Sequence, residues 1–190
     1  LFRSTTSLHA ETALASDALS GPWTPGISLE LANSIRLPML RDSRLVVQLG
    51  AGWTGSDKPA DRLYIGGHEG EYRVRGVEHG YDSGTHVLLG SAEYVVKLVP
   101  IERSPGSASI FIDDLQASVF VDAGSAGQQF TLASLVAGVG VELGVSVVPG
   151  YTDARALFSI GLARPIAWGQ EAPRPQSDFT IYLKLSGNPL

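Results

Sequence analysis

The chain contains no cysteine, and no part of it approaches the run of eighteen or more consecutive apolar residues that a membrane-spanning helix needs. The first absence excludes disulfides, thiolate catalysis and zinc sites built on cysteine. It also suits an oxidising compartment, where free thiols are a liability. The second absence excludes a helical membrane protein.

Clustered positive charge is also missing. The 190 residues carry a formal net charge of -5 at pH 7. Binding to phosphate groups is driven by clustered Lys and Arg, so we expect no nucleic-acid partner. The chain opens at Leu1 without a charged segment followed by an apolar one, and we expect an export signal to have been removed or to lie outside this sequence.

What the chain does have is a period of two. Apolar and polar residues alternate along eight segments, as in β-strands with one apolar face. The clearest segment lies between Leu135 and Val147, where every odd position is apolar and most even positions hold glycine, glutamate or serine. The predicted strands are residues 2–14, 27–37, 44–54, 85–98, 115–124, 135–147, 154–162 and 179–186. The pattern predicts an all-β fold in one domain, residues 1–190.

Two architectures share this alternation. A soluble sandwich turns the apolar face inward, whereas a transmembrane barrel turns it outward. The polar face here holds single charges among Gly, Ala, Ser, Thr and Gln, as in a crowded or water-filled lumen. The best segments reach the length of about nine to eleven residues that a tilted strand needs to cross a bilayer, and short connections alternate with long ones. These features favour an antiparallel transmembrane β-barrel, with about eight strands in this chain.

The longest connection, approximately residues 55–84, carries motifs that continue into the next strands. It contains Leu63-Tyr64-Ile65-Gly66-Gly67 and then Val74-Arg75-Gly76-Val77. The following strands contain Gly90-Ser91-Ala92-Glu93-Tyr94 and Phe120-Val121-Asp122-Ala123-Gly124. In order and spacing these motifs resemble the C-terminal half of the barrel in the BamA and two-partner-secretion transporter superfamily, also called the bacterial surface antigen family.

The resemblance covers roughly Arg44 to the C-terminus and implies a role for one arginine. In that family a Val-Arg-Gly-aromatic motif sits at the tip of a loop folded back into the lumen, and a Phe-x-Asp-x-Gly motif lies on the barrel wall. Arg75 would then be held by Glu93 and Asp122, which the alternation independently places on the polar face. An arginine inside a lumen needs paired carboxylates, because an unpaired charge shielded from water is costly.

The predicted loop-anchor residues are Arg75, Gly76, Glu93 and Asp122. The motif residues that support this prediction are Gly66, Gly67, Val74, Phe120 and Gly124. The sequence departs from the family pattern in two places. Val77 stands where an aromatic residue is expected, and the last residues are Ser186-Gly187-Asn188-Pro189-Leu190 where the family has a terminal aromatic.

The resemblance also implies a function and a location. We expect a barrel of the Gram-negative bacterial outer membrane that inserts or translocates proteins, with eight strands forming half of a sixteen-stranded barrel or the whole of a short relative. Its expected partners are the lipid bilayer, unfolded outer-membrane or secreted polypeptides, and periplasmic accessory proteins. Sheet edges could template an incoming strand, so neither enzymatic chemistry nor a cofactor is required.

Two other functions remain open on the sequence. One is a passive outer-membrane anchor or pore for a soluble domain outside this sequence. The other is a soluble β-sandwich binding module, which would stay monomeric without detergent.

The sequence gives little support for a metal site, a nucleotide-binding loop or a catalytic site. The long connection holds several potential metal ligands, but their spacing fits no standard zinc or calcium pattern, so we predict no metal site: His68, Glu69, Glu71, Glu78 and His79. Gly138 and Gly140 lack the strand-to-helix context of a nucleotide loop, and no Gly-x-Ser-x-Gly elbow is present. We expect no catalytic site, and we interpret these glycines as positions of strand curvature or close packing in a lumen.

Overall fold

The computed structural model describes residues 4–15, 24–37, 43–56, 58–104, 110–130, 132–150, 155–167, 174–175 and 178–188. These residues form β-strands and one turn of 3-10 helix, η1 (Pro59–Asp61). The strands are β1 (Ser4–Ala15), β2 (Thr24–Leu37), β3 (Ser43–Thr54), β4 (Leu63–Ile65), β5 (Asp82–Gly84), β6 (His86–Arg103), β7 (Ile110–Gly127), β8 (Val136–Pro149), β9 (Arg155–Ala167) and β10 (Thr180–Asn188).

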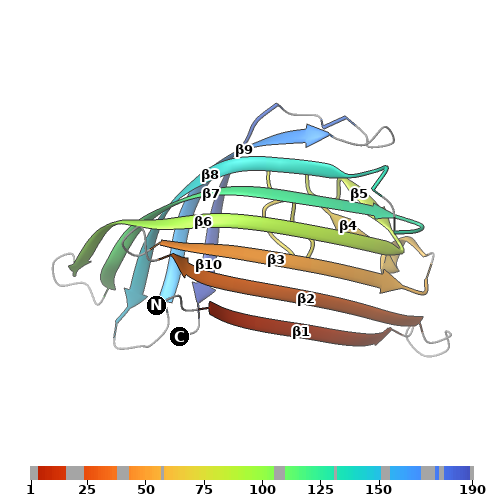
Figure 1. The fold of residues 1–190 in the computed structure, drawn as a ribbon, viewed down its shortest axis with the longest axis horizontal. Helices are drawn as coiled ribbons and strands as arrows, with labels where there is room; N and C mark the ends of the chain where they lie inside the picture. The colour runs from red at the N-terminus through yellow and green to blue at the C-terminus, as the bar shows by residue number, and fades with distance from the viewer. Residues whose placement is uncertain are drawn as a thin grey trace.

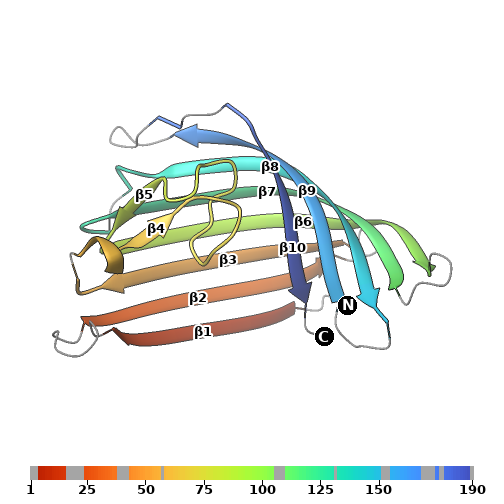
Figure 2. The ribbon, with the colours of Figure 1, turned by 180° about the vertical axis from the view of Figure 1, so that it is seen from behind.

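Eight of these strands form one antiparallel sheet in the order β1-β2-β3-β6-β7-β8-β9-β10. The sheet curves into a trough, and β9 and β10 bend round toward its concave side (Figures 1 and 2). The prediction of an all-β antiparallel fold is confirmed. No pairing of β1 with β10 occurs among the described residues, so the described sheet is open rather than a closed barrel.

The strands are long, and their connections alternate in length. Both β6 and β7 have 18 residues, well beyond the length of about five or six residues that is usual in soluble sheets. At one end of the sheet the connections span residues 38–42, 104–109 and 150–154. At the other end they span residues 16–23, 55–85, 128–135 and 168–179. All the longer connections therefore leave the same end of the sheet.

The longest connection has secondary structure of its own, which the sequence analysis did not predict. Its two ends pair as the short antiparallel strands β4 and β5, and an isolated bridge joins Gly67 to Val74. The segment lies against the concave side of the sheet, in front of β6 and β7 in Figure 2. We call residues 58–84 the inner loop.

The two faces of the sheet have opposite character. Antiparallel partners point to the same face, so a row of apolar residues continues from strand to strand. One such row pairs Val119 of β7 with Val141 of β8, and Val141 with Leu162 of β9. The convex face exposes many large apolar side chains: Ile27, Leu29, Leu31, Leu49, Leu98, Val119, Val121, Val141, Leu143, Phe158, Ile160, Leu162, Ile181, Leu183 and Leu185.

The main apolar core lies between the inner loop and the concave face. From the loop it contains Ile65, Tyr72, Val74 and Val77, and from the sheet Val87, Leu89, Ala126 and Val136. Val87 and Leu89 are large apolar residues on the face that also carries the charged cluster described below. Their burial under the loop offsets the cost of placing them there, since burying one such side chain is worth about 1.5–3 kcal/mol.

Glycines in the sheet allow the loop to come this close. A Cβ atom at Gly138 of β8 would overlap the carbonyl oxygen of Arg75, and one at Gly124 of β7 would lie 3.0 Å from Cγ2 of Val74. The interpretation of Gly138 as a position of close packing is therefore confirmed.

Candidate functional site

Arg75 is fully buried, although arginine is among the residues least often found inside proteins. It lies in the turn at the tip of the inner loop, where the backbone N–H of Val77 donates to the carbonyl of Val74 at 3.3 Å. Gly76 follows with a φ of 91°, a conformation that side chains rarely adopt, and an added Cβ would lie 3.0 Å from the Cβ of Ala163. The turn therefore requires glycine at position 76.

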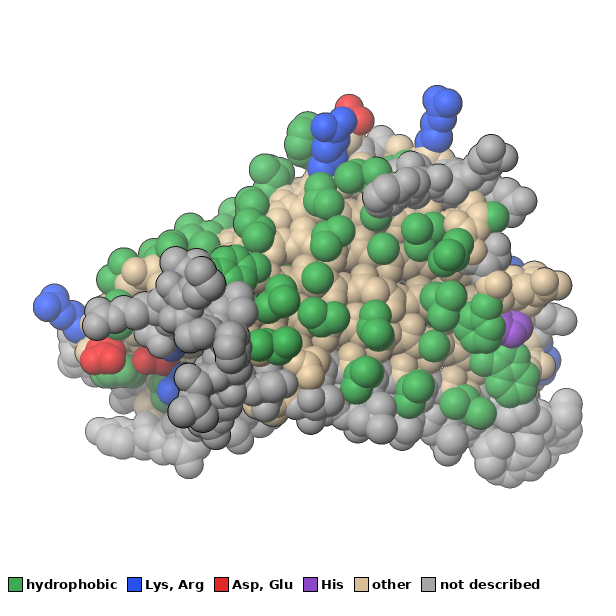
Figure 3. Space-filling view, in the orientation of Figure 1, with side chains coloured by type: hydrophobic (Ala, Val, Ile, Leu, Met, Phe, Trp, Pro, Cys, Tyr) green, Lys and Arg blue, Asp and Glu red, His purple; other side chains and the backbone are tan. Residues whose placement is uncertain are grey.

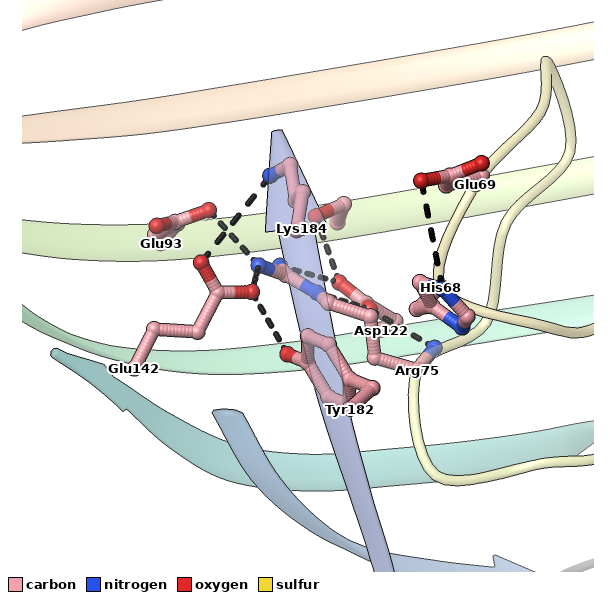
Figure 4. Close-up of polar contacts among 9 residues, drawn as sticks. His68, Glu69, Arg75, Glu93, Asp122, Glu142, Tyr182 and Lys184 are labelled. Atoms are coloured by element: carbon pink, nitrogen blue, oxygen red, sulfur yellow. Dashed lines mark hydrogen bonds and ion pairs between the residues drawn. The ribbon is translucent and has the colours of Figure 1, made fainter. Parts of the chain in front are cut away.

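The carboxylate of Asp122 on β7 binds both the guanidinium and the backbone N–H of Arg75 (Figure 4). Its Oδ2 accepts from Nε of Arg75 at 2.7 Å and from the backbone N–H of Arg75 at 3.0 Å, and its Oδ1 accepts from Nη2 at 2.9 Å. Ser91 of β6 donates to Oδ1 at 2.7 Å. This fork-to-fork pairing is the strongest geometry available to an arginine and a carboxylate, and it ties the backbone of the loop to the wall.

Two further carboxylates bind the remaining end of the guanidinium. Nη1 of Arg75 donates to Oε2 of Glu93 on β6 at 2.9 Å and to Oε1 of Glu142 on β8 at 3.0 Å. Three adjacent strands therefore each supply one carboxylate to the same arginine. The side chain of Arg75 makes four hydrogen bonds to carboxylates.

An aromatic ring supports the flat face of the guanidinium. Cζ of Arg75 lies 3.5 Å from the ring centroid of Phe120, a close cation–π contact. The ring extends over Gly140 of β8, where an added Cβ would lie 2.6 Å from Cζ of Phe120. Phe120 thus sets the plane in which Arg75 meets its carboxylates.

The edge strand β10 joins the cluster from the other side. Oη of Tyr182 donates to Oε1 of Glu142 at 2.5 Å, and Nζ of Lys184 lies 3.9 Å from Oε2 of Glu142. The ring of His68 stacks on that of Tyr182, with centroids 5.1 Å apart. Thr180 donates to the carbonyl of Gly76 at 3.4 Å. The inner loop therefore contacts β10 both directly and through Glu142.

The surroundings hold Arg75 in its charged form. Burial alone would lower the pKa of Arg75, but the hydrogen bond and charge of Asp122, together with the charges of Glu93 and Glu142, outweigh burial and raise this pKa above its ordinary value. Arg75 and Lys184 supply two positive charges against the three carboxylates.

The predicted contacts of Arg75 with Glu93 and Asp122 are confirmed. The supporting motif residues also meet at this place. Gly66 donates to the carbonyl of Tyr72 at 3.2 Å and Gly67 to that of Val77 at 2.9 Å, which shapes the loop behind Arg75. Phe120 supports the guanidinium, and Val74 packs on Gly124.

The sequence analysis missed Glu142, Tyr182 and Lys184 as members of the cluster. A signal for them was present, because the alternation put all three on the polar face of their segments, and Glu142 was the one charged residue on that face between residues 135 and 147. What the alternation could not provide was the register of β8 against β9 and of β9 against β10.

The arrangement is suited to holding a loop. Each carboxylate of the cluster already accepts from Arg75, and the described residues contain no group of three metal-ligating side chains. A pocket of about 190 Å³, lined by charged, polar and apolar side chains, lies beside the cluster on the concave face, so this part of the trough stays open. Its lining includes Arg44, Glu93, Ser118, Glu142, Ser159 and Lys184.

We expect replacement of Asp122 by alanine to destabilise the protein by about 3–5 kcal/mol, because it leaves the charge of Arg75 buried with its main partner removed. The free energy of unfolding from urea titrations measures this effect. The matched control is Asp113→Ala, which removes the partner of the partly exposed Arg155 and should cost at most about 1 kcal/mol. Equal costs for the two variants would contradict the assignment of Asp122 as the main partner.

No family model, curated protein or solved structure matches this chain. Among the described residues, no helix has the length and apolar character needed to span a membrane. The fold, the two faces of the sheet and the Arg75 cluster are therefore the basis for a functional proposal.

Proposed function

We propose that this chain forms part of the wall of an outer-membrane β-barrel that inserts or translocates other polypeptides, and that the inner loop, anchored by Arg75, lies in its lumen. The observation that carries this proposal is the apolar convex face. Every strand of the main sheet from β2 to β10 exposes large apolar side chains. On the side of the sheet seen in Figure 3, few charged groups interrupt them.

Such a face is costly in water. Monomeric soluble proteins rarely expose contiguous apolar patches larger than about 300–600 Å². Here Val141, at the centre of the face, is 50% exposed, and Leu183 on β10 is 75% exposed. In a soluble sandwich a second layer would cover these side chains, and no second layer packs on them among the described elements. A lipid bilayer would cover them all at once.

The dimensions of the strands support the same environment. A tilted strand crosses a bilayer in about nine to eleven residues, and the strands of the main sheet run from 9 to 18 residues. Outer-membrane barrels also carry short turns at one rim and longer loops at the other. The connections of this sheet are divided in that way.

The inner loop supports a barrel of more than eight strands. A closed eight-stranded barrel has an interior just wide enough for side chains. Here the concave side holds a chain segment with its own hairpin and apolar core, as well as an open pocket. Further strands would be needed to close a wall around these contents. This agrees with the sixteen-stranded barrel that the resemblance implies.

Polypeptide handling is supported by the contents of the trough and by the edges of the sheet. The residues resembling the Val-Arg-Gly and Phe-x-Asp-x-Gly motifs meet in the Arg75 cluster. The sheet ends at β10, whose outer side has no strand partner among the described residues. An unpaired edge can accept an extended polypeptide through main-chain hydrogen bonds.

We expect the purified chain to fold in detergent micelles and not in plain buffer, because only an apolar solvent covers the convex face. Circular dichroism would report the β-structure, and a heat-dependent shift in gel mobility would report a stable barrel-like species. A stable β-rich monomer in plain buffer would overturn the membrane proposal and favour a soluble binding module.

A single substitution on the convex face gives an independent test. We expect Val141→Lys to destabilise the protein in lipid by about 2–4 kcal/mol, since a lysine facing the bilayer centre is unfavourable. On a water-exposed face the same change would fall within about 0.5 kcal/mol. The free energy of unfolding in vesicles measures the difference. Glu102→Lys, at an exposed position near the end of β6, is the control and should have little effect.

The polypeptide-handling proposal is tested with vesicles that contain the purified protein and an unfolded outer-membrane client. We expect the wild type to speed folding of the client, measured by its heat-modifiable gel mobility. Arg75→Ala should return the rate toward that of empty vesicles, because the loop loses its anchor. Arg155→Ala, at a partly exposed arginine paired with Asp113, should leave the rate unchanged. A wild type no faster than empty vesicles would instead favour a passive anchor or pore.

A further inference from the structure

The edge strand β10 is fastened to the inner loop by more than its backbone pairing with β9. We propose that Tyr182 is a positioning residue that links β10, through Glu142, to Arg75, so that docking of the inner loop holds the edge strand of the sheet in place. This link lies outside the motifs that suggested the Arg75 anchor.

The geometry of three neighbouring strands makes the link possible. Glu142 of β8, Gly161 of β9 and Tyr182 of β10 lie in one row, because Glu142 pairs with Gly161 and Gly161 pairs with Tyr182. The ring of Tyr182 extends across β9 at Gly161, where an added Cβ would overlap the ring. The hydroxyl of Tyr182 therefore reaches a carboxylate two strands away.

The carboxylate it reaches is the one that also binds the loop. Oε1 of Glu142 accepts from Oη of Tyr182 at 2.5 Å and from Nη1 of Arg75 at 3.0 Å. Tyr182 is 5% exposed and Arg75 is fully buried, so water competes little for either bond. Hydrogen bonds to a charged group are the stronger kind, worth about 1.5–3 kcal/mol. If Arg75 moved away from Glu142, the side chain of Glu142 would be held less firmly, and so would the hydroxyl of Tyr182 that binds it.

Direct contacts between the loop and β10 reinforce the same coupling. His68 stacks on the ring of Tyr182, and Thr180 donates to the carbonyl of Gly76 beside Arg75. These contacts come from opposite ends of the segment between Gly67 and Val77. The loop therefore holds β10 at several points and not through Glu142 alone.

The link holds a strand at the edge of the sheet, where backbone pairing is weakest. Interior strands are held by two neighbours, whereas β10 pairs only with β9 among the described strands. An edge strand with one neighbour opens more easily than an interior strand. Side-chain fastening to the loop thus adds to the backbone pairing that β10 has on one side only among the described strands. In the proposed barrel, loop docking would set the register in which β10 meets a partner strand, an extension that rests on the proposed function.

Hydrogen–deuterium exchange of the full chain tests the link, in whichever of buffer or detergent folds it. The outcome is thus independent of whether the membrane proposal holds. The variants are Tyr182→Phe, which removes only the hydroxyl, Arg75→Ala, and the two combined. The matched control is Tyr94→Phe on β6, because the hydroxyl of Tyr94 has no hydrogen-bond partner among the described residues. Peptides covering residues 180–188 report β10, and peptides covering residues 110–127 report an interior strand.

We expect Tyr182→Phe to speed exchange in β10 by about tenfold or more, the factor that corresponds to one charge-assisted hydrogen bond, while β7 stays unchanged. Arg75→Ala should also speed exchange in β10. In the double variant, the increase in the exchange rate of β10 should be much smaller than the product of the increases in the two single variants. The reason is that both substitutions break the same link. Tyr94→Phe should behave as wild type.

Unchanged exchange of β10 in Tyr182→Phe would overturn the proposal, as would effects of the two substitutions that multiply fully in the double variant. Should Arg75→Ala fail to fold, Arg75→Lys takes its place, since lysine keeps the charge but cannot bind several carboxylates with a planar fork. Exchange that rises equally in β7 and β10 would indicate global destabilisation and would also overturn the specific link.

Discussion

The buried charge of Arg75 is the constraint on which the rest of the concave side depends. A guanidinium excluded from water persists only where carboxylates bind it, and here Asp122, Glu93 and Glu142 come from three adjacent strands. Binding them fixes the tip of the inner loop against the sheet. It also requires β6, β7 and β8 to keep one register, because a slip of one residue would turn a carboxylate to the other face.

The two faces of the sheet differ in their chemistry. The convex face offers aliphatic and aromatic side chains with few polar groups, which a bilayer would solvate. The concave face combines an apolar core under the loop with a charged cluster and an open pocket. The loop makes this combination stable, because it covers Val87 and Leu89 and supplies the arginine that binds all three carboxylates.

Small residues let these groups approach one another. Gly138 lies beneath the carbonyl of Arg75, Gly140 beneath the ring of Phe120, and Gly161 beneath the ring of Tyr182. In each case backbone or side-chain atoms of a neighbouring strand or of the loop occupy the space that a Cβ would fill. The glycines of β8 and β9 are therefore part of the cluster, even though they make none of its hydrogen bonds.

The sequence by itself determined the strands and the face to which their residues point, because a period of two depends only on neighbouring residues. The same local pattern, with the family resemblance, led to Arg75, Glu93 and Asp122. The tertiary structure alone decided that Glu142 joins them and that Tyr182 connects the edge strand. Those contacts join residues 67 and 40 positions apart, so they depend on the register of several strands in succession. The hairpin of the inner loop and the core beneath it likewise arise from packing against the sheet, which no local pattern records.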